Sequence, residues 1–171
     1  VLTRAWEAGV ERILVPGIDL ATSQAAIELA DEYAHVYAAV GVHPNSATSW
    51  DSTTLEALEM MAAHPKVVAI GEIGLDYYRN RAPHPLQKRI LREQISLAGR
   101  VDLPVVIHTR NASPDQRACF ADILAIIKDQ RTELSEIYPG VFHSFLESEA
   151  EAQLALEQGF HVGITGPVTF K

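Results

Sequence analysis

Short apolar segments alternate with amphipathic segments along the whole chain. The apolar segments are rich in Val, Ile or Phe and are expected to form strands at Arg12–Pro16, Val36–Val42, Val67–Ile73, Leu103–His108, Gly140–Phe145 and His161–Thr165. The amphipathic segments space their apolar residues for one buried face and predict helices at Ala21–Tyr33, Thr53–Ala63, Leu86–Val101, Asp115–Asp129 and Ser148–Gln158. Strict alternation without hairpin signals indicates parallel strands joined by crossover helices. The chain is therefore expected to be an α/β protein.

Polar residues follow four of these strands at regular intervals. His43, Glu72, His108 and His143 close the segments AAVGVH, VVAIGE, LPVVIH and GVFH, and they are 29, 36 and 35 residues apart. One βα unit of a TIM (β/α)8 barrel has about this length, and the catalytic residues of such barrels lie at the carboxyl ends of several strands. The pattern predicts a barrel with about six of its eight units present, in which residues 1–171 form a single partial domain.

Glu72 poses a physical problem because it ends an otherwise apolar run, VVAIGE. An ionised carboxylate in a strand that is covered on both faces needs a charged partner or a metal ion. We expect that partner to be a divalent cation bound by Glu72, His108 and His143. His43 is predicted to be catalytic together with Glu72, either as a direct ligand or in contact with the ligands. The alternative for any one of these histidines is a structural residue at a strand end.

The remaining histidines and the cysteine carry weaker signals. His35 and His64 close helices just before strands and are interpreted as structural, as is His161 at the start of a strand. His84, in the loop RNRAPHP, receives no assignment. Cys119 is the only cysteine and lies in a predicted helix, which favours a packed thiol over a nucleophile.

Composition narrows the class of protein. Of the 171 residues, 47% are hydrophobic and 21% charged, as in ordinary globular proteins. No apolar run approaches the roughly 18 residues of a transmembrane helix, and no signal peptide is evident, so we expect a cytoplasmic protein without a membrane partner. A net charge of −8 argues against a broad basic surface for nucleic acid, so phosphate contacts should be local. Oligomeric state cannot be read from the sequence.

Both ends of the chain are expected to be cut. The first residue is Val1, inside a segment with Leu2, Ala5, Trp6 and Val10 on one side of a predicted helix. The last residue is Lys171, directly after a strand-like segment.

The ordered motifs resemble the TatD family of metal-dependent hydrolases, a branch of the amidohydrolase-like TIM barrels. They are GVHPNSA, AIGEIGLDYYR, LPVVIHTRNASPD and GVFHSF, followed by GITGPVTFK, and the resemblance covers essentially the whole chain. It implies that Glu72, His108 and His143 are metal ligands, with His43 at the same mouth. Asp76 also matches a family position, although its own chemistry could equally cap the following loop. The family's first His-any-His strand and last aspartate strand are not in this sequence, so the chain resembles the middle of a TatD protein.

The resemblance also implies an activity. One or two divalent ions, Mg, Mn or Zn, would lower the pKa of a bound water and polarise the phosphoryl oxygen during hydrolysis of DNA phosphodiester bonds. The DNA partner is expected to be single-stranded or a 3′ end, trimmed in the 3′ to 5′ direction. Arg110 and Arg79 are candidate phosphate-binding residues, with Tyr77 and Tyr78 nearby for base stacking. Two alternatives stay open: an ester hydrolase, for example on D-aminoacyl-tRNA, and a truncated chain without activity.

Overall fold

Six parallel strands form one sheet, and they occur in the sheet in the same order as in the chain. The computed structural model describes residues 1–113 and 116–169. Its strands are β1 (Ile13–Pro16), β2 (Val36–Val40), β3 (Val67–Asp76), β4 (Val105–Arg110), β5 (Gly140–Phe142) and β6 (His161–Val162). The predicted α/β class with parallel strands is confirmed.

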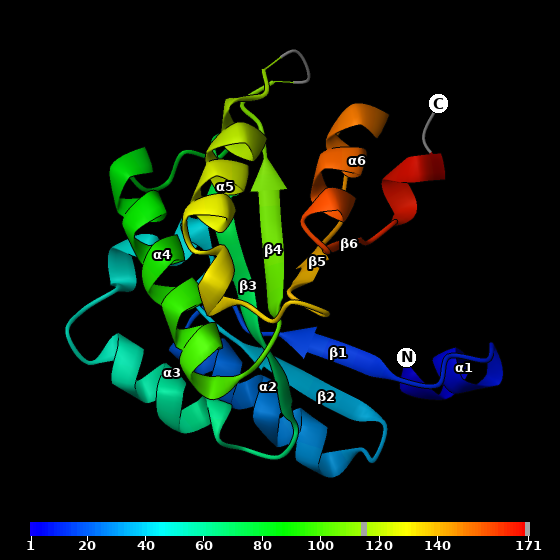
Figure 1. Cartoon of the computed structure of the whole chain (residues 1–171). Coiled ribbons are helices and arrows are strands. Elements are labelled where there is room, and N and C mark those ends of the chain that lie inside the picture. The colour runs from blue at the N-terminus through cyan, green and yellow to red at the C-terminus, as the bar shows by residue number, and fades with distance from the viewer. Residues whose placement is uncertain (114–115, 170–171) are drawn as a thin grey trace.

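Helices connect the strands and cover one side of the sheet (Figure 1). They are α2 (Leu20–Glu32), α3 (Thr54–Ala62), α4 (His84–Val101), α5 (Ala118–Asp129) and α6 (Glu149–Glu157). The short helix α1 (Leu2–Glu7) precedes β1, and there are 3-10 turns at η1 (Pro44–Ser49), η2 (Arg131–Glu133) and η3 (Gly166–Thr169). Their apolar faces pack on the strands in one large core, whose largest fully buried side chains are Phe120, Phe142 and Phe160. Burial of these apolar faces is the main stabilising contribution to such a layered fold.

The sheet is open in the described part of the chain, with β1 and β6 as its edges. Closure into an eight-stranded barrel and a single domain spanning residues 1–171 therefore stay predictions. On the face away from the main core, a second and smaller apolar cluster joins Ala39, Ala69 and Val106. Within residues 1–113 and 116–169, no helix is long and apolar enough to cross a membrane.

Several predicted boundaries were wrong, and the backbone explains them. β3 continues past Ile73 to Asp76 because its last residues pair with Thr109 and Arg110 of β4. β5 stops at Phe142 instead of Phe145 because Ser144, which lies between them, has a φ of 50° that is incompatible with a strand. β6 covers only His161–Val162 of the predicted segment.

The predicted helix at Asp115–Asp129 begins at Ala118, and Asp115 lies outside the described residues. The side chain of Asn111 accepts a hydrogen bond from the Cys119 N–H at 3.0 Å, which satisfies a donor of the first turn. His84 is the first residue of α4 and not a loop residue.

Candidate metal centre

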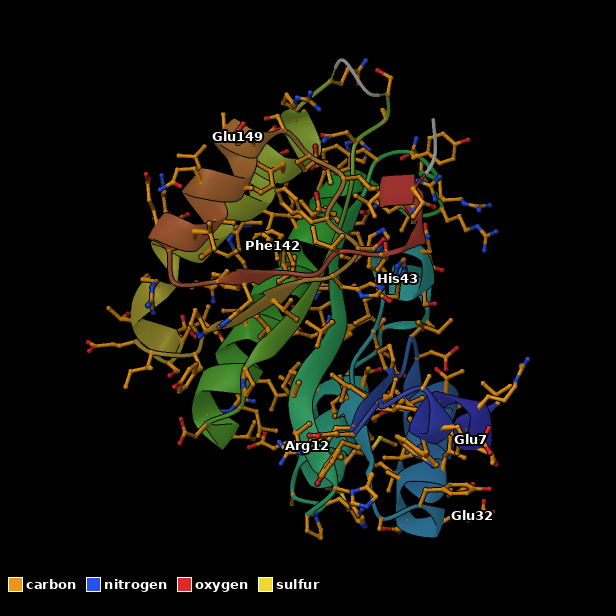
Figure 2. The ribbon with its side chains drawn as sticks, turned by 90° about the vertical axis from the view of Figure 1, so that its right-hand side faces the viewer. Glu7, Arg12, Glu32, His43, Phe142 and Glu149 are labelled. Carbon is orange, nitrogen blue, oxygen red and sulfur yellow. The ribbon has the colours of Figure 1, made fainter. Side chains whose placement is uncertain are left out.

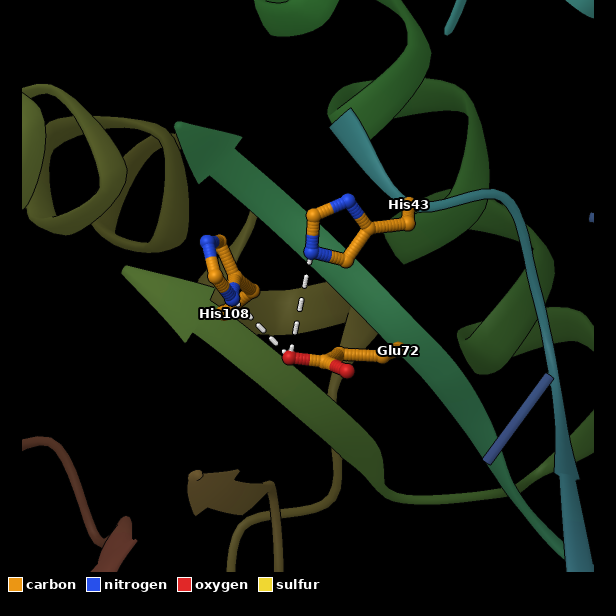
Figure 3. A group of neighbouring side chains, drawn as sticks. All are labelled: His43, Glu72 and His108. Carbon is orange, nitrogen blue, oxygen red and sulfur yellow. Dashed lines mark hydrogen bonds and ion pairs between the residues drawn. The ribbon is translucent and has the colours of Figure 1, made fainter. Parts of the chain in front are cut away.

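The carboxyl ends of β2, β3 and β4 bring three polar side chains together. His43 follows β2, Glu72 is in β3 and His108 is in β4, and their side chains point toward one another in Figure 3. Their potential ligand atoms all lie within 4.8 Å of one another. His43 and Arg12 lie toward opposite ends of the sheet (Figure 2), as expected for residues after one parallel strand and before another.

His108 joins two carboxylates. Its Nδ1 lies 2.9 Å from Glu72 Oε1 and its Nε2 lies 3.3 Å from Asp76 Oδ2. A protonated imidazole donates at both nitrogens, so a charged His108 ring satisfies both carboxylates at once. In a metal centre, one nitrogen of such a histidine binds the ion and the other donates to a carboxylate.

The charges in this group are mutually stabilised. Burial alone would lower the pKa of His108, but hydrogen bonds with Asp76 and Glu72 hold the pKa above its ordinary value. Burial alone would raise the pKa of Glu72, and the hydrogen bond and charge of His108 outweigh it, so the pKa is lowered. The pKa of Asp76 is lowered as well, since its hydrogen bonds to His108, to the Arg79 N–H and to Asn45 overcome the effect of burial.

His43 has a fixed tautomer in its neutral form. Its Nδ1 accepts a hydrogen bond from the Asn45 backbone N–H at 3.0 Å, so the proton of the neutral ring must be on Nε2. That Nε2 lies 4.0 Å from Glu72 Oε1. Burial, and then the charge of His108, lower the pKa of His43 to about 4, which keeps the ring neutral at physiological pH. His43 therefore presents an N–H donor to the site.

Asp76 is the site residue that sequence reasoning placed least well. It is 1% exposed, and its carboxylate accepts from the Arg79 N–H at 2.7 Å and from Asn45 Nδ2 at 2.9 Å. Asp76 thus caps the following loop, which was one of the two roles considered from the sequence, and it also contacts His108. The signal available in the sequence was a second acidic residue four positions after Glu72 in the same segment.

The predicted ligand His143 is placed differently from Glu72 and His108. Its backbone N–H donates to the Ile107 carbonyl at 2.8 Å, one residue beyond the end of β5, and its side chain is exposed. It lines the same hollow as His43, Glu72 and His108, but the compact group of three contains His43 in its place. The ligand set of Glu72, His108 and His143 stays a prediction.

Three arginines line this hollow of about 450 Å³: Arg79, Arg81 and Arg110. The Arg110 guanidinium lies over the Tyr78 ring, 4.1 Å from its centroid. A neighbouring cleft of about 470 Å³ is lined by Arg110 and Tyr78, so the Arg110 side chain borders both spaces. Positive charge gathers here although the chain carries a net charge of −8.

The donor set fits a divalent cation. A carboxylate and an imidazole nitrogen 2.9 Å apart are ligand types shared by Zn²⁺ and other transition ions, and carboxylates also suit Mg²⁺ and Mn²⁺. Asn45 supports this interpretation, because its buried Oδ1 at the edge of the site has no hydrogen-bond partner among the residues that the structure describes, while its Nδ2 donates to Asp76.

Three of the other histidines, His35, His64 and His84, make contacts typical of structural residues. His64 pairs with Asp31 at 3.4 Å, and His35 packs edge-on against Trp6 with the ring centroids 6.1 Å apart. His84 stacks on Tyr77, with centroids 3.6 Å apart and the rings nearly parallel. Tyr77 is buried in the core, so of the two tyrosines predicted for base stacking Tyr78 is the exposed one.

Comparison with known proteins gives consistent results. A family model described as TatD related DNase matches residues 1–171. The chain is 40% identical over 171 residues to the uncharacterized metal-dependent hydrolase YabD of Bacillus subtilis, covering 100% of this chain and 63% of that protein. It is 36% identical over 166 residues to the 3′-5′ ssDNA/RNA exonuclease TatD of Escherichia fergusonii, covering 97% of this chain and 60% of that protein.

Solved structures show the same likeness. The crystal structure of YJJV, a TatD homologue from Escherichia coli K12, superposes with a TM-score of 0.87 at 32% identity, covering 99% of this chain and 62% of that one. A TatD-like protein from Archaeoglobus fulgidus has a TM-score of 0.68 at 20% identity, with 96% and 70% covered, and this likeness concerns the fold alone. The chain spans 60–63% of the length of the two curated relatives described above.

Proposed function

Because the chain belongs to the family of TatD-related DNases, we propose that the protein carrying it is a metal-dependent hydrolase of phosphodiester bonds in DNA. The observation that carries the proposal is the contact of His108 with both Glu72 and Asp76 at the strand ends, beside a hollow lined by arginines. Relatives named 3′-5′ ssDNA/RNA exonuclease support single-stranded 3′ ends as the substrate. A cytoplasmic location stays a prediction.

The residues divide into metal-holding and orienting groups. Glu72 and His108 hold the cation, and His143 joins them from the rim of the hollow. Asp76 accepts from His108 Nε2, which leaves His108 Nδ1 as the nitrogen on the Glu72 side. A bound divalent ion supplies the positive charge that polarises a phosphoryl oxygen and stabilises the leaving oxygen.

The remaining groups act on the substrate. His43 offers its Nε2–H to a phosphate oxygen without changing its protonation state, because the Asn45 N–H keeps its Nδ1 deprotonated. Arg110 and Arg79 bind the phosphate through charge-assisted hydrogen bonds. Tyr78, 57% exposed and stacked with Arg110, provides a flat surface for a base.

The test of the metal assignment is Glu72→Gln, which keeps the shape of the side chain and removes its charge. We expect the affinity for Mn²⁺, measured by isothermal titration calorimetry, to fall at least about tenfold, since even residues behind the ligands contribute 10–100-fold in metal sites. Glu93→Gln is the control, because Glu93 pairs with Arg89 on α4 away from the hollow. Unchanged Mn²⁺ affinity in Glu72→Gln would show that the ligand assignment is wrong.

The substrate is tested separately. A 5′-labelled single-stranded oligodeoxynucleotide and a D-aminoacyl ester of tRNA are incubated with the protein, with and without Mg²⁺ or Mn²⁺. The proposal expects metal-dependent shortening of the oligonucleotide from its unlabelled 3′ end. Ester hydrolysis with an intact oligonucleotide would contradict the proposed substrate while leaving the metal site in place.

A further inference from the structure

Helix α4 carries two buried glutamines on one face. Gln87 and Gln94 are each 1% exposed and are seven residues apart, so they lie two turns apart on the same side of the helix. Their neighbours on this face are apolar residues such as Ile90, Leu91 and Ile95. A buried primary amide is unfavourable unless its donors and acceptor are paired, so the partners of these side chains are informative.

Gln94 holds the backbone just before His43. Its Oε1 accepts from the Val42 N–H at 2.7 Å, and its Nε2 donates to the Val42 carbonyl at 3.0 Å. Val42 lies beyond the end of β2, where these two groups have left the sheet ladder. One side-chain amide therefore replaces the missing strand neighbour and fixes the direction in which His43 leaves the backbone.

Gln87 holds the backbone of Asp76 in the same manner. Its Oε1 accepts from the Asp76 N–H at 2.9 Å, and its Nε2 donates to the Asp76 carbonyl at 3.3 Å. The same Nε2 also lies 2.8 Å from the Ala82 carbonyl, which ties the loop after β3 to the helix. Asp76 in turn contacts His108 through its carboxylate.

We propose that Gln87 and Gln94 are positioning residues of the metal centre, each acting as a two-point amide clamp on the backbone that carries a site residue. Gln94 sets His43, and Gln87 sets Asp76 and through it the orientation of His108. The proposal rests on the function proposed above in one respect only, namely that Mn²⁺ binding is used as one of its two tests. Its physical basis is that four hydrogen bonds from one helix hold the backbone of Val42, beyond the end of β2, and the backbone of Asp76, the last residue of β3.

The test uses Gln94→Met and Gln87→Met, which keep an unbranched side chain of similar size and remove the hydrogen bonds. Leu97→Ala is the control, because Leu97 is fully buried in α4 and makes no polar contact through its side chain, so the substitution destabilises the helix without touching the clamps. All measurements are made well below the lowest melting temperature of the set. Gln94→Glu, which keeps an acceptor for the Val42 N–H, replaces Gln94→Met if the latter does not fold.

The first readout needs no metal. Long-range ¹H–¹⁵N spectra of the histidine rings report the tautomer of His43 and the protonation and hydrogen bonding of His108 in the metal-free protein. We expect Gln94→Met to shift the His43 signals toward a mixture of tautomers, and Gln87→Met to shift the His108 signals. Leu97→Ala should leave both sets unchanged. Histidine signals that shift no more in the glutamine variants than in Leu97→Ala would overturn the proposal.

The second readout is Mn²⁺ affinity. We expect each glutamine variant to bind Mn²⁺ about 10- to 100-fold more weakly, as for other residues that orient metal ligands, and Leu97→Ala to stay within about twofold of the parent. If the parent protein itself does not bind Mn²⁺, the proposed function fails, and the histidine spectra still decide whether the clamps position the site. Equal Mn²⁺ affinity in the parent and both glutamine variants would refute the clamps as positioning residues.

Discussion

A single added methyl group at Gly74 should damage both the sheet and the metal centre. Gly74 has a φ of 143°, which L residues rarely adopt, and a Cβ built on it would lie 2.0 Å from the His108 carbonyl oxygen. Ordinary contacts of a Cβ begin at 3.4 Å, so β3 or β4 would have to move by more than 1 Å beside the residue that carries a predicted ligand. Gly74→Ala therefore combines a backbone penalty with a clash against another backbone.

The two contributions can be estimated and separated. An L residue at positive φ costs about 1–2 kcal/mol, and overpacking in a rigid interior costs about 1–3 kcal/mol more. Gly9→Ala isolates the first contribution, because Gly9 has a φ of 87° and a Cβ there would lie more than 4 Å from every atom that the structure describes outside its chain neighbours. In a chain of this size, 1 kcal/mol shifts the melting temperature by about 2–4 °C.

We expect Gly74→Ala, at about 2–5 kcal/mol in total, to lower the melting temperature by ~4–20 °C, and Gly9→Ala, at about 1–2 kcal/mol, to lower it by ~2–8 °C, both measured by differential scanning calorimetry without metal. Mn²⁺ binding should weaken only in Gly74→Ala, since only this change forces the His108 backbone to move. Equal decreases in melting temperature in the two variants would contradict the close approach of β3 and β4 at Gly74.

Three further outcomes follow from other parts of the molecule. Arg110→Ala should lower kcat/KM on single-stranded DNA about 10- to 100-fold, as expected for a lost charge-assisted hydrogen bond. It should change the melting temperature by under about 2 °C, and Arg89→Ala, at an exposed arginine of α4, is the control. Asp19→Ala removes the cap of α2, where Asp19 Oδ1 accepts from the Thr22 N–H at 2.8 Å, and should cost about 1 kcal/mol in chemical unfolding. Hydrogen bonds from Thr22 lower the pKa of Asp19 below 3.8. The difference in stability between the parent and Asp19→Ala should therefore be present at neutral pH and should shrink as the pH falls below about 4, where the carboxylate protonates. Burial raises the pKa of Cys119 from 9.0 to about 11, so a disulfide reagent should modify this thiol at pH 8 only after unfolding, and rapid modification of the native protein would contradict its burial. Because the thiol deprotonates less readily in the folded state than in the unfolded state, the free energy of unfolding should also fall as the pH rises from 9 toward 11.

The part of the site that was predictable depends on local sequence. The proximity of Glu72 and His108 was predictable because each is a polar residue next to a buried apolar run, and parallel strands bring their carboxyl ends to one edge of the sheet. The alternation of strands and helices likewise follows from periodicity within each segment. These signals need only neighbouring residues and the handedness of the crossover.

The remaining features depend on contacts between distant residues. The tautomer of His43 follows from a turn geometry that places the Asn45 N–H on Nδ1. The role of Gln94 depends on a contact with Val42, 52 positions earlier in the chain. A glutamine in an amphipathic helix is ordinarily exposed, so periodicity alone gave no reason to assign it to the site.

The two proposed clamps should fix the length of the interval between Gln87 and Gln94 in homologous proteins. Each residue turns an α-helix by 100°, so a single insertion or deletion between Gln87 and Gln94 would rotate one amide away from its strand end while the other stayed in place. Homologous proteins that keep both clamps should therefore show no length variation in this interval, although they change freely on the outer face of the helix. Lengthening should be tolerated instead in surface loops. An alignment of homologues would thus reveal the clamps as an interval of constant length before any single substitution is made.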